Sequence, residues 1–221
     1  QTNSDSILAY HQDEFAQNIA NKINSTGAEG VILDLEYPFE VNSYTGTSNT
    51  PLLESTMKKI YTKVKAINST YTVSLCTPPY FDENTVCFKN PNLSNYIDFV
   101  FIMGYDYYWN GPTGANSPFY NNFTRYGLKY AVAEQSECYG KDKIIYGVPL
   151  YAYEYTTNSN LPGASITSAN QVLLKNVNPS AYGRQWDSDS NTPYYYYFAD
   201  GVYHQVWYED TESLALKYQY I

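Results

Sequence analysis

The pattern of apolar and polar positions along this chain switches repeatedly between a helical and a strand period. Apolar residues recur at helical spacing over residues 7–23, which predicts an amphipathic helix that Gly27 ends. Near-continuous apolar runs, as at residues 98–104, are typical of strands that are buried on both faces. In chain order, the predicted strands are 31–36, 72–76, 98–104 and 143–151, and the predicted helices are 7–23, 52–67, 122–135 and 211–220.

This alternation of strand and helix predicts an α/β fold with a parallel sheet that is covered on both faces. Residues 153–210 depart from the pattern, because they are rich in Asn, Ser, Pro and Tyr and contain β-like runs at 193–198 and 202–208. We expect this segment to be a small mixed α+β lobe inserted after a strand.

Composition and charge narrow the class of protein. The chain has 221 residues, of which 43% are hydrophobic and 16% charged, and this suits a folded domain rather than a disordered chain. A net charge of −9 argues against nucleic acid as a partner, because phosphate binding needs a basic surface. No apolar run reaches about 18 residues, so no membrane span is expected. The 27 tyrosines suit either contact with sugars, through ring faces and hydroxyls, or packing.

The glycosylation sequons and the cysteines indicate which cellular compartment the protein would occupy. Four glycosylation sequons favour the secretory route, and they begin at Asn24, Asn68, Asn92 and Asn122. An oxidising compartment would allow a disulfide between Cys76 and Cys87, leaving Cys138 free or paired outside this chain. No residue spacing suits a metal, and no cofactor is expected. The chain begins at Gln1 without a visible signal peptide, so we expect a processed or incomplete chain.

Two carboxylates end the first predicted strand. Asp34 and Glu36 are two residues apart, so they point to the same side of a strand. In a sheet covered on both faces this arrangement is unfavourable unless the protein uses the carboxylates, and barrel enzymes place their chemistry at this end of their strands. The alternative is a pair of exposed carboxylates at the rim of the sheet. A proton donor beside a second carboxylate is what cleavage of a glycosidic bond requires.

The stretch that contains this pair resembles a known family. Residues 29–36, Glu-Gly-Val-Ile-Leu-Asp-Leu-Glu, are similar to the D-G-x-D-x-D-x-E signature of glycoside hydrolase family 18. Residues 103–107 resemble the M-x-Y-D-Y strand end of that family, and residues 114–118 resemble the loop that follows it. Residues 147–155 and 186–208 resemble its di-N-acetylchitobiase branch.

The resemblance implies a (β/α)8 TIM barrel, of which this chain would supply about strands four to seven. Residues 1–152 would form the partial barrel, residues 153–210 the insertion lobe, and residues 211–221 a returning barrel helix. Four β-α units do not close an eight-stranded barrel. The missing strands would come from the rest of the protein or from another chain.

The resemblance also implies roles for individual residues. Glu36 would protonate the leaving oxygen and later activate water, while Asp34 would orient the 2-acetamido group of the substrate and stabilise an oxazolinium ion. The substrate is then its own nucleophile, the substrate-assisted exception among retaining glycosidases. Tyr105 would bind the acetamide carbonyl, and Asp106 a sugar hydroxyl. Further candidates for sugar contact, with packing as the alternative, are Tyr151, Tyr153 and Trp207.

The implied protein is a lysosomal or secreted glycosidase that hydrolyses β-1,4-linked N-acetylglucosamine oligosaccharides. Two departures from the signature matter. Glu29 replaces its first Asp, and Ile32 replaces its middle acidic position, where chitobiases are expected to carry Asn. The polar side chain at that position supports Asp34 from behind, so its replacement by isoleucine is expected to weaken catalysis.

Two other interpretations remain open at this stage. The protein could be a chitinase-like glycan-binding or structural glycoprotein that hydrolyses poorly, which Ile32 favours and the retained Glu36 opposes. It could also be an unrelated β/α domain whose carboxylates match by chance, which the order of the several motifs opposes.

Overall fold

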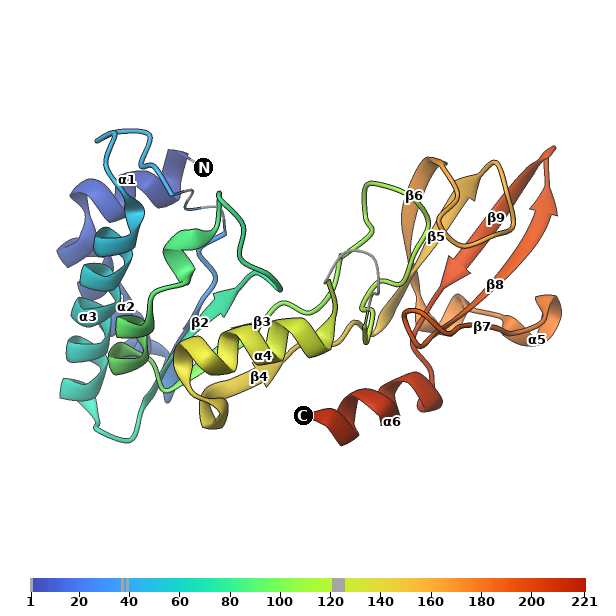
Figure 1. The fold of residues 1–221 in the computed structure, drawn as a ribbon. Helices are drawn as coiled ribbons and strands as arrows, with labels where there is room; N and C mark the ends of the chain where they lie inside the picture. Colours follow the sequence, from blue (N-terminus) through green and yellow to red (C-terminus); the bar gives the residue numbers. More distant parts are fainter. Residues whose placement is uncertain (1, 37, 39, 121–125) are drawn as a thin grey trace. The chain divides into compact units, whose positions relative to one another are not determined.

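The computed structural model describes residues 2–36, 38, 40–120 and 126–221 (Figure 1). The chain divides into two compact units. Unit 1 comprises Gln1–Met103 and Ala133–Ile145, and unit 2 comprises Gly104–Val132 and Tyr146–Ile221.

A four-stranded sheet in the order β1-β2-β3-β4 organises unit 1. Its strands are β1 (Gly30–Leu33), β2 (Thr72–Thr77), β3 (Phe99–Ile102) and β4 (Ile144–Tyr146). β1 pairs with β2, and β2 with β3, in parallel. The predicted parallel α/β sheet is therefore confirmed.

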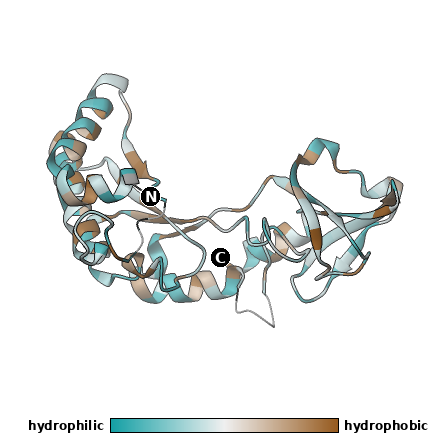
Figure 2. Ribbon diagram, turned by 90° about the horizontal axis from the view of Figure 1, so that it is seen from above, coloured by the Kyte–Doolittle hydropathy of each residue, from teal (hydrophilic) through white to brown (hydrophobic). Residues whose placement is uncertain are grey.

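Helices α1 (Thr2–Tyr10), α2 (Gln12–Thr26) and α3 (Asn49–Ile67) accompany this sheet. α2 ends at Gly27, whose φ of 69° places it in the left-handed region that suits glycine. The hydroxyl of Ser48 caps α3 by accepting a hydrogen bond from the Thr50 N–H. Hydrophobic and hydrophilic residues alternate along these helices (Figure 2), as expected of helices with one buried side. Short 3₁₀ helices lie at Val86–Phe88, Pro91–Tyr96 and Lys141–Lys143.

The two faces of the unit 1 sheet differ in burial. Leu33 and Leu75, opposite each other in β1 and β2, are buried, with exposed fractions of 5% and 0%. The other face carries exposed apolar side chains, namely Ile32 at 62% and Phe99 at 37%. The expectation of a sheet covered on both faces is therefore wrong for the described residues, because the helices α2 and α3 contact β1 and β2 while Ile32 and Phe99 lie uncovered.

Unit 2 contains a five-stranded sheet in the order β6-β5-β9-β8-β7. Its strands are β5 (Tyr151–Thr157), β6 (Ile166–Leu173), β7 (Gln185–Asp187), β8 (Thr192–Ala199) and β9 (Val202–Trp207), with short helices at Leu174–Asn176 and α5 (Pro179–Tyr182). All of the described pairings are antiparallel. The β-like runs predicted at 193–198 and 202–208 correspond to β8 and β9.

Aromatic residues form the core of this second sheet. Tyr155 and Trp207 are 0% and 1% exposed, and they belong to one cluster with Tyr153 and Tyr194. The Trp207 indole stacks on Tyr194, with ring centroids 4.6 Å apart and planes 12° apart. Much of the tyrosine content therefore serves packing in the lobe.

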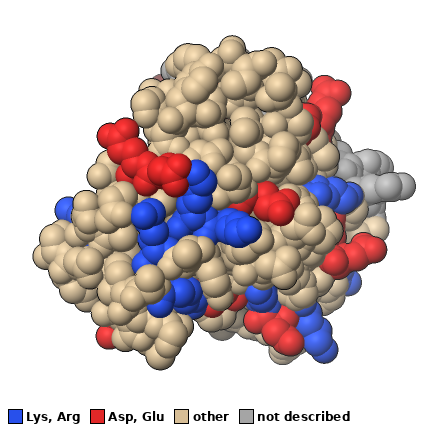
Figure 3. Space-filling view, turned by 90° about the vertical axis from the view of Figure 1, so that its left-hand side faces the viewer, with Lys and Arg blue, Asp and Glu red and all other residues tan. Residues whose placement is uncertain are grey.

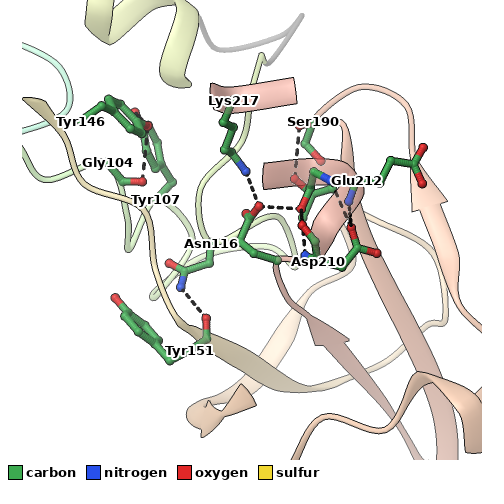
Figure 4. A network of polar contacts seen from close by, with 12 residues as sticks. Gly104, Tyr107, Asn116, Tyr146, Tyr151, Ser190, Asp210, Glu212 and Lys217 are labelled. Carbon is green, nitrogen blue, oxygen red and sulfur yellow. Dashed lines mark hydrogen bonds and ion pairs between the residues drawn. The ribbon is translucent and has the colours of Figure 1, made fainter. Parts of the chain in front are cut away.

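Helix α6 (Thr211–Tyr220) follows β9 and begins where it was predicted. The Asp210 carboxylate caps it by accepting hydrogen bonds from the N–H groups of Glu212 and Ser213. Lys217 on this helix forms an ion pair with Glu209, 2.5 Å from Nζ to Oε2, and both side chains are buried (Figure 4).

Three predicted boundaries need correction. The helix predicted at 7–23 is two helices, α1 and α2, that meet at His11, where φ is −123° and ψ is 20°. The helix predicted at 122–135 is α4 (Leu128–Tyr139), and residues 121–125 lie outside the described residues. The strand predicted at 143–151 is divided between β4 and β5, which lie in different sheets.

The surface of α3 mixes charges of both signs. The helix carries four lysines, and Figure 3 shows basic side chains gathered beside acidic ones on this side of unit 1. Lys59 pairs with Asp13 at 2.5 Å and Lys65 with Asp98 at 2.9 Å. None of the helices in the described part of the chain is both long and apolar enough to cross a membrane.

Candidate active site

The carboxylates of unit 1 stand where β1 ends. Gly30 opens this strand, and a Cβ there would lie 2.4 Å from the Thr72 carbonyl, so the close approach of β1 to β2 requires glycine. Leu33 and Leu35 are buried, whereas Asp34 and Glu36 are exposed. The alternation of a strand thus continues past the last hydrogen-bonded residue and keeps both carboxylates on the uncovered side.

Cys76 of β2 lies close to this pair. Burial, together with the charges of Asp34 and Glu36, raises the pKa of its thiol to about 11. The thiol is therefore neutral at physiological pH, which makes it a poor nucleophile.

The disulfide expected between Cys76 and Cys87 is not formed in this structure. All three cysteines are free thiols. The Cys87 Sγ instead donates a hydrogen bond to the Pro38 carbonyl at 3.0 Å, which directs it toward the segment after Glu36.

The segment that follows Glu36 is tied to α1 by buried polar contacts. The Asp5 carboxylate accepts hydrogen bonds from the Ser43 N–H at 2.9 Å and from Asn49 Nδ2 at 2.8 Å. Burial alone raises the pKa of Asp5, but these hydrogen bonds outweigh it and hold the pKa below its ordinary value. The Ser4 hydroxyl donates to the Glu36 carbonyl at 3.4 Å, so α1 also touches the backbone of the candidate proton donor.

Unit 2 contributes a second group of polar side chains around Asp106. This residue has a φ of 61°, in the left-handed region, and Asn116 Oδ1 accepts a hydrogen bond from its N–H at 2.7 Å. Its Oδ1 accepts hydrogen bonds from the hydroxyls of Tyr151 at 2.5 Å and Tyr153 at 3.0 Å. Its other oxygen, Oδ2, has no hydrogen-bond partner among the described residues and can accept from a ligand.

Asn116 holds this group together from behind. Besides binding the Asp106 N–H, it donates from Nδ2 to the Tyr151 carbonyl at 3.3 Å (Figure 4). Burial raises the pKa of Tyr151, and the hydrogen bond to Asp106 and its charge raise it further. Burial likewise raises the pKa of Tyr153. Both phenols are therefore neutral donors to Asp106 at physiological pH.

The backbone before Asp106 requires glycine. A Cβ at Gly104 would lie 2.0 Å from the ring of Tyr146, whose hydroxyl donates to the Gly104 carbonyl at 3.3 Å. Tyr105 follows directly, and its ring meets that of Tyr151 edge to face, with centroids 6.4 Å apart. Within unit 2, the structure thus brings together four of the predicted residues: Tyr105, Asp106, Tyr151 and Tyr153.

Trp207 shares a buried aromatic cluster with Tyr153. Its side chain is 1% exposed and packs in the sheet core, and its indole N–H donates to Gln205 Oε1 at 3.0 Å. No face of the indole is open to a sugar in this structure. Trp207 therefore packs in the core, which was the alternative to sugar contact.

The predicted glycosylation sites lie on unit 1 as far as the structure describes them. Asn24, Asn68 and Asn92 are exposed. Asn122, the fourth predicted site, lies outside the described residues. In the part of the chain that the structure describes, no group of three or more His, Cys, Asp or Glu residues could hold a metal ion.

Two contributors were missed by sequence reasoning. Asn116 lies in the loop at 114–118 that carried part of the family resemblance, so that loop was the available signal. Gln171, whose Nε2 donates to the Tyr153 hydroxyl at 3.3 Å, gave no signal, because only the pairing of β5 with β6 brings it there.

Comparison with known proteins gives one consistent family match. The model of the family described as glycosyl hydrolases family 18 matches residues 4–221. Di-N-acetylchitobiase of Mus musculus is 28% identical over 231 residues, covering 92% of this chain and 60% of its own length. The Homo sapiens di-N-acetylchitobiase is also 28% identical and is covered over 57% of its length.

Among solved structures, an immunomodulatory active chitinase from Trichuris suis superposes with a TM-score of 0.81 at 22% identity. The alignment covers 98% of this chain and 65% of that one. This likeness establishes the fold. The chain spans about 60% of the length of the curated relatives it matches.

Proposed function

This chain belongs to glycosyl hydrolases family 18, and we propose that its protein hydrolyses β-1,4-linked N-acetylglucosamine oligosaccharides. The observation that carries the proposal is the pair Asp34 and Glu36, exposed together at the carboxyl end of a parallel strand within the family signature. The di-N-acetylchitobiases that resemble the chain over 92% of its length support this choice of substrate.

In the proposed reaction, the carboxyl group of Glu36 donates its proton to the glycosidic oxygen. The acetamido oxygen of the substrate attacks C1 as the bond from C1 to the leaving oxygen breaks, and Asp34 stabilises the resulting oxazolinium ion. The Glu36 carboxylate then takes a proton from water, whose oxygen attacks C1 and restores the acetamido group. Two successive displacements at C1 retain the anomeric configuration.

Asp106 and the tyrosines would bind the sugar. Oδ2 of Asp106 is the open acceptor for a sugar hydroxyl, because Tyr151 and Tyr153 already donate to Oδ1. Tyr105 would donate to the acetamide carbonyl. Fixing the carboxylate through two tyrosines and Asn116 lowers the entropy lost when a sugar binds.

The proposal includes the domain organisation. Residues 1–152 and 211–221 would belong to a TIM barrel, and residues 153–210 would be its inserted lobe. The remaining strands would come from the rest of the protein or from another chain, and they would cover the face that carries Ile32 and Phe99. A structure of the natural protein in which this sheet face stays open to solvent would refute the barrel.

We also propose passage through the secretory route to a lysosome or to the outside of the cell. The exposed sequon asparagines Asn24, Asn68 and Asn92 support this. A glycosidase that removes N-linked glycans should increase the gel mobility of the natural protein, and an unchanged mobility would count against this route.

A second candidate function is glycan binding without efficient hydrolysis. Ile32 favours it, because an apolar side chain stands where the family signature has a polar one behind Asp34. Binding of chito-oligosaccharides without turnover would establish this alternative.

The stereochemistry of the first product tests the proposed mechanism. Proton NMR of N,N′-diacetylchitobiose hydrolysis should show the β-anomer forming first, and a substrate without the 2-acetamido group should not react. Initial release of the α-anomer, or equal hydrolysis of the substrate that lacks the acetamido group, would rule out substrate assistance.

A further inference from the structure

Gln171 extends the polar group around Asp106 onto the edge strand of the unit 2 sheet. It lies in β6 directly opposite Tyr153 of β5, so the two side chains share one face of the sheet. Gln171 is exposed, while Tyr153 is 5% exposed. The sheet thus joins a buried tyrosine that contacts Asp106 to an amide at the surface.

The direction of each hydrogen bond in this chain is fixed by chemistry. A carboxylate oxygen accepts hydrogen bonds, so Tyr153 uses its one hydroxyl hydrogen as the donor to Asp106. The Tyr153 oxygen must then accept from Gln171, which can donate only through Nε2. Gln171 Oε1 is therefore the open end of the chain, and it has no hydrogen-bond partner among the described residues.

An apolar side chain lies beside this open amide. Leu173, two residues along β6 and on the same face, is 58% exposed and stands opposite Tyr151. A pyranose ring presents an apolar C–H face and an edge of hydroxyl and acetamide groups. An exposed leucine next to an open amide oxygen matches both parts of such a ring.

We propose that Gln171 and Leu173 form an additional sugar-binding subsite on β6, next to the sugar that Asp106 binds. Gln171 Oε1 accepts a hydrogen bond from a hydroxyl or acetamide N–H group, and Leu173 contacts the apolar face of the same sugar unit. This subsite rests on the proposed function, because it takes a further unit of the same N-acetylglucosamine oligosaccharide.

Four substitutions in the full natural protein test this subsite. Gln171→Ala removes the amide, Gln171→Glu keeps its shape but loses the donor to Tyr153, and Leu173→Ala removes the apolar contact. Asn170→Ala is the matched control, because Asn170 is the exposed neighbour on the opposite face of β6. KM and kcat are measured on chito-oligosaccharides from the disaccharide to the hexasaccharide.

Gln171→Ala should raise KM for the longer oligosaccharides about 3- to 10-fold, the range expected for one neutral hydrogen bond. Its kcat should stay within about twofold of wild type, because the bond is made equally in ground and transition states. Gln171→Glu should raise KM at least as much, Leu173→Ala should raise it as well, and Asn170→Ala should leave it unchanged. Unchanged KM for Gln171→Ala at every length, or an equal rise in Asn170→Ala, would overturn the subsite.

The subsite and the proposed function can fail separately. Turnover by the wild type with no effect of the β6 variants refutes the subsite alone. If the wild type shows no turnover, the hydrolase proposal fails, and calorimetric titration with chitohexaose still decides on the subsite. If Gln171→Ala binds chitohexaose more weakly than Asn170→Ala does, the subsite is supported. Equal binding by the two variants overturns the subsite.

Discussion

Ile32 occupies the strand position two residues before Asp34 and on the same side of β1. Its neighbour across the pairing is Ser74, and its side chain is 62% exposed. An isoleucine offers Asp34 no hydrogen bond, so the carboxylate that would stabilise the oxazolinium ion lacks support at the position where the family signature is polar.

Restoring a polar group at this position should therefore speed the reaction. Ile32→Asn is expected to raise kcat on a chitobioside about tenfold, toward the lower end of what one hydrogen bond to a charged group contributes. Ile32→Val is the matched control, because it shortens the side chain without adding a donor. Equal kcat values for the two variants would show that the position does not act through Asp34.

Single residues differ in how far sequence predicts them. Asp34, Glu36 and Asp106 became candidates from the sequence because each follows an apolar run in a recognisable motif. The contacts of Gln171 could not, because strand pairing between distant segments creates them. Trp207 follows a pattern that suits either core or surface, and only its burial against Tyr194 decides between them.

Helix α6 depends on a buried charge. Lys217 is fully buried and pairs with Glu209, which also accepts a hydrogen bond from the Ser213 hydroxyl at 2.7 Å. Burial lowers the pKa of Lys217 and raises that of Glu209, while their mutual attraction opposes both shifts. Each charge is therefore tolerated in the interior only because the other is present.

Removing one partner should destabilise the protein strongly. Lys217→Met leaves a buried carboxylate without its cation and is expected to lower the free energy of unfolding by about 3–5 kcal/mol. Adding Glu209→Gln to this variant should recover part of the loss, because the unpaired charge disappears. Urea denaturation measures the free energy of unfolding of both variants. A Lys217→Met variant as stable as wild type would show that the two charges do not depend on each other.

The contacts of Asp5, which join helix α1 to the segment after Glu36, should stabilise the fold to an extent that depends on pH. The folded pKa of Asp5 lies below its unfolded value, so its carboxylate stabilises the fold above about pH 4, and this stabilisation is lost as pH falls through the folded pKa. Asp5→Asn should lower the free energy of unfolding by about 1–3 kcal/mol at neutral pH. The difference in free energy of unfolding between Asp5→Asn and wild type should become smaller at acid pH.

Asp13 provides the control for this effect. Its side chain is 80% exposed in its pair with Lys59, so Asp13→Asn should change stability by less than about 1 kcal/mol. Denaturant midpoints at neutral and acid pH compare the variants. A gap between Asp5→Asn and wild type that stays constant with pH would show that the Asp5 charge does not stabilise the fold.

Elements with strong local signals were predictable, whereas those set by pairing were not. α6 was predicted at its observed bounds, and the structure shows that Asp210 and Ser213 form a capping box where it begins. β6 was missed, because this exposed edge strand is largely polar and has no continuous apolar run. β4 and β5 were predicted as one strand because the apolar pattern of residues 143–151 continues through the break between the two sheets.

For the whole molecule, the family fold was predictable from the order of its motifs, but the burial of the sheet was not. A fully apolar strand predicts cover on both faces, but Ile32, Phe99 and Ile145 are apolar and exposed in this structure. In the proposed barrel, their cover would come from strands outside this segment of chain. The chain spans about 60% of the length of the Mus musculus di-N-acetylchitobiase that it matches, so the proposed activity is tested on the full natural protein.

The most direct test is turnover of a fluorogenic N,N′-diacetylchitobioside by the full natural protein, measured between about pH 4 and pH 8. Glu36→Gln and Glu29→Gln are assayed beside it, since Glu29 is an exposed carboxylate of the same signature with no proposed role in catalysis. We predict turnover by wild type and Glu29→Gln and none by Glu36→Gln. Undiminished turnover by Glu36→Gln, or binding of the substrate without turnover by all three, would contradict this prediction.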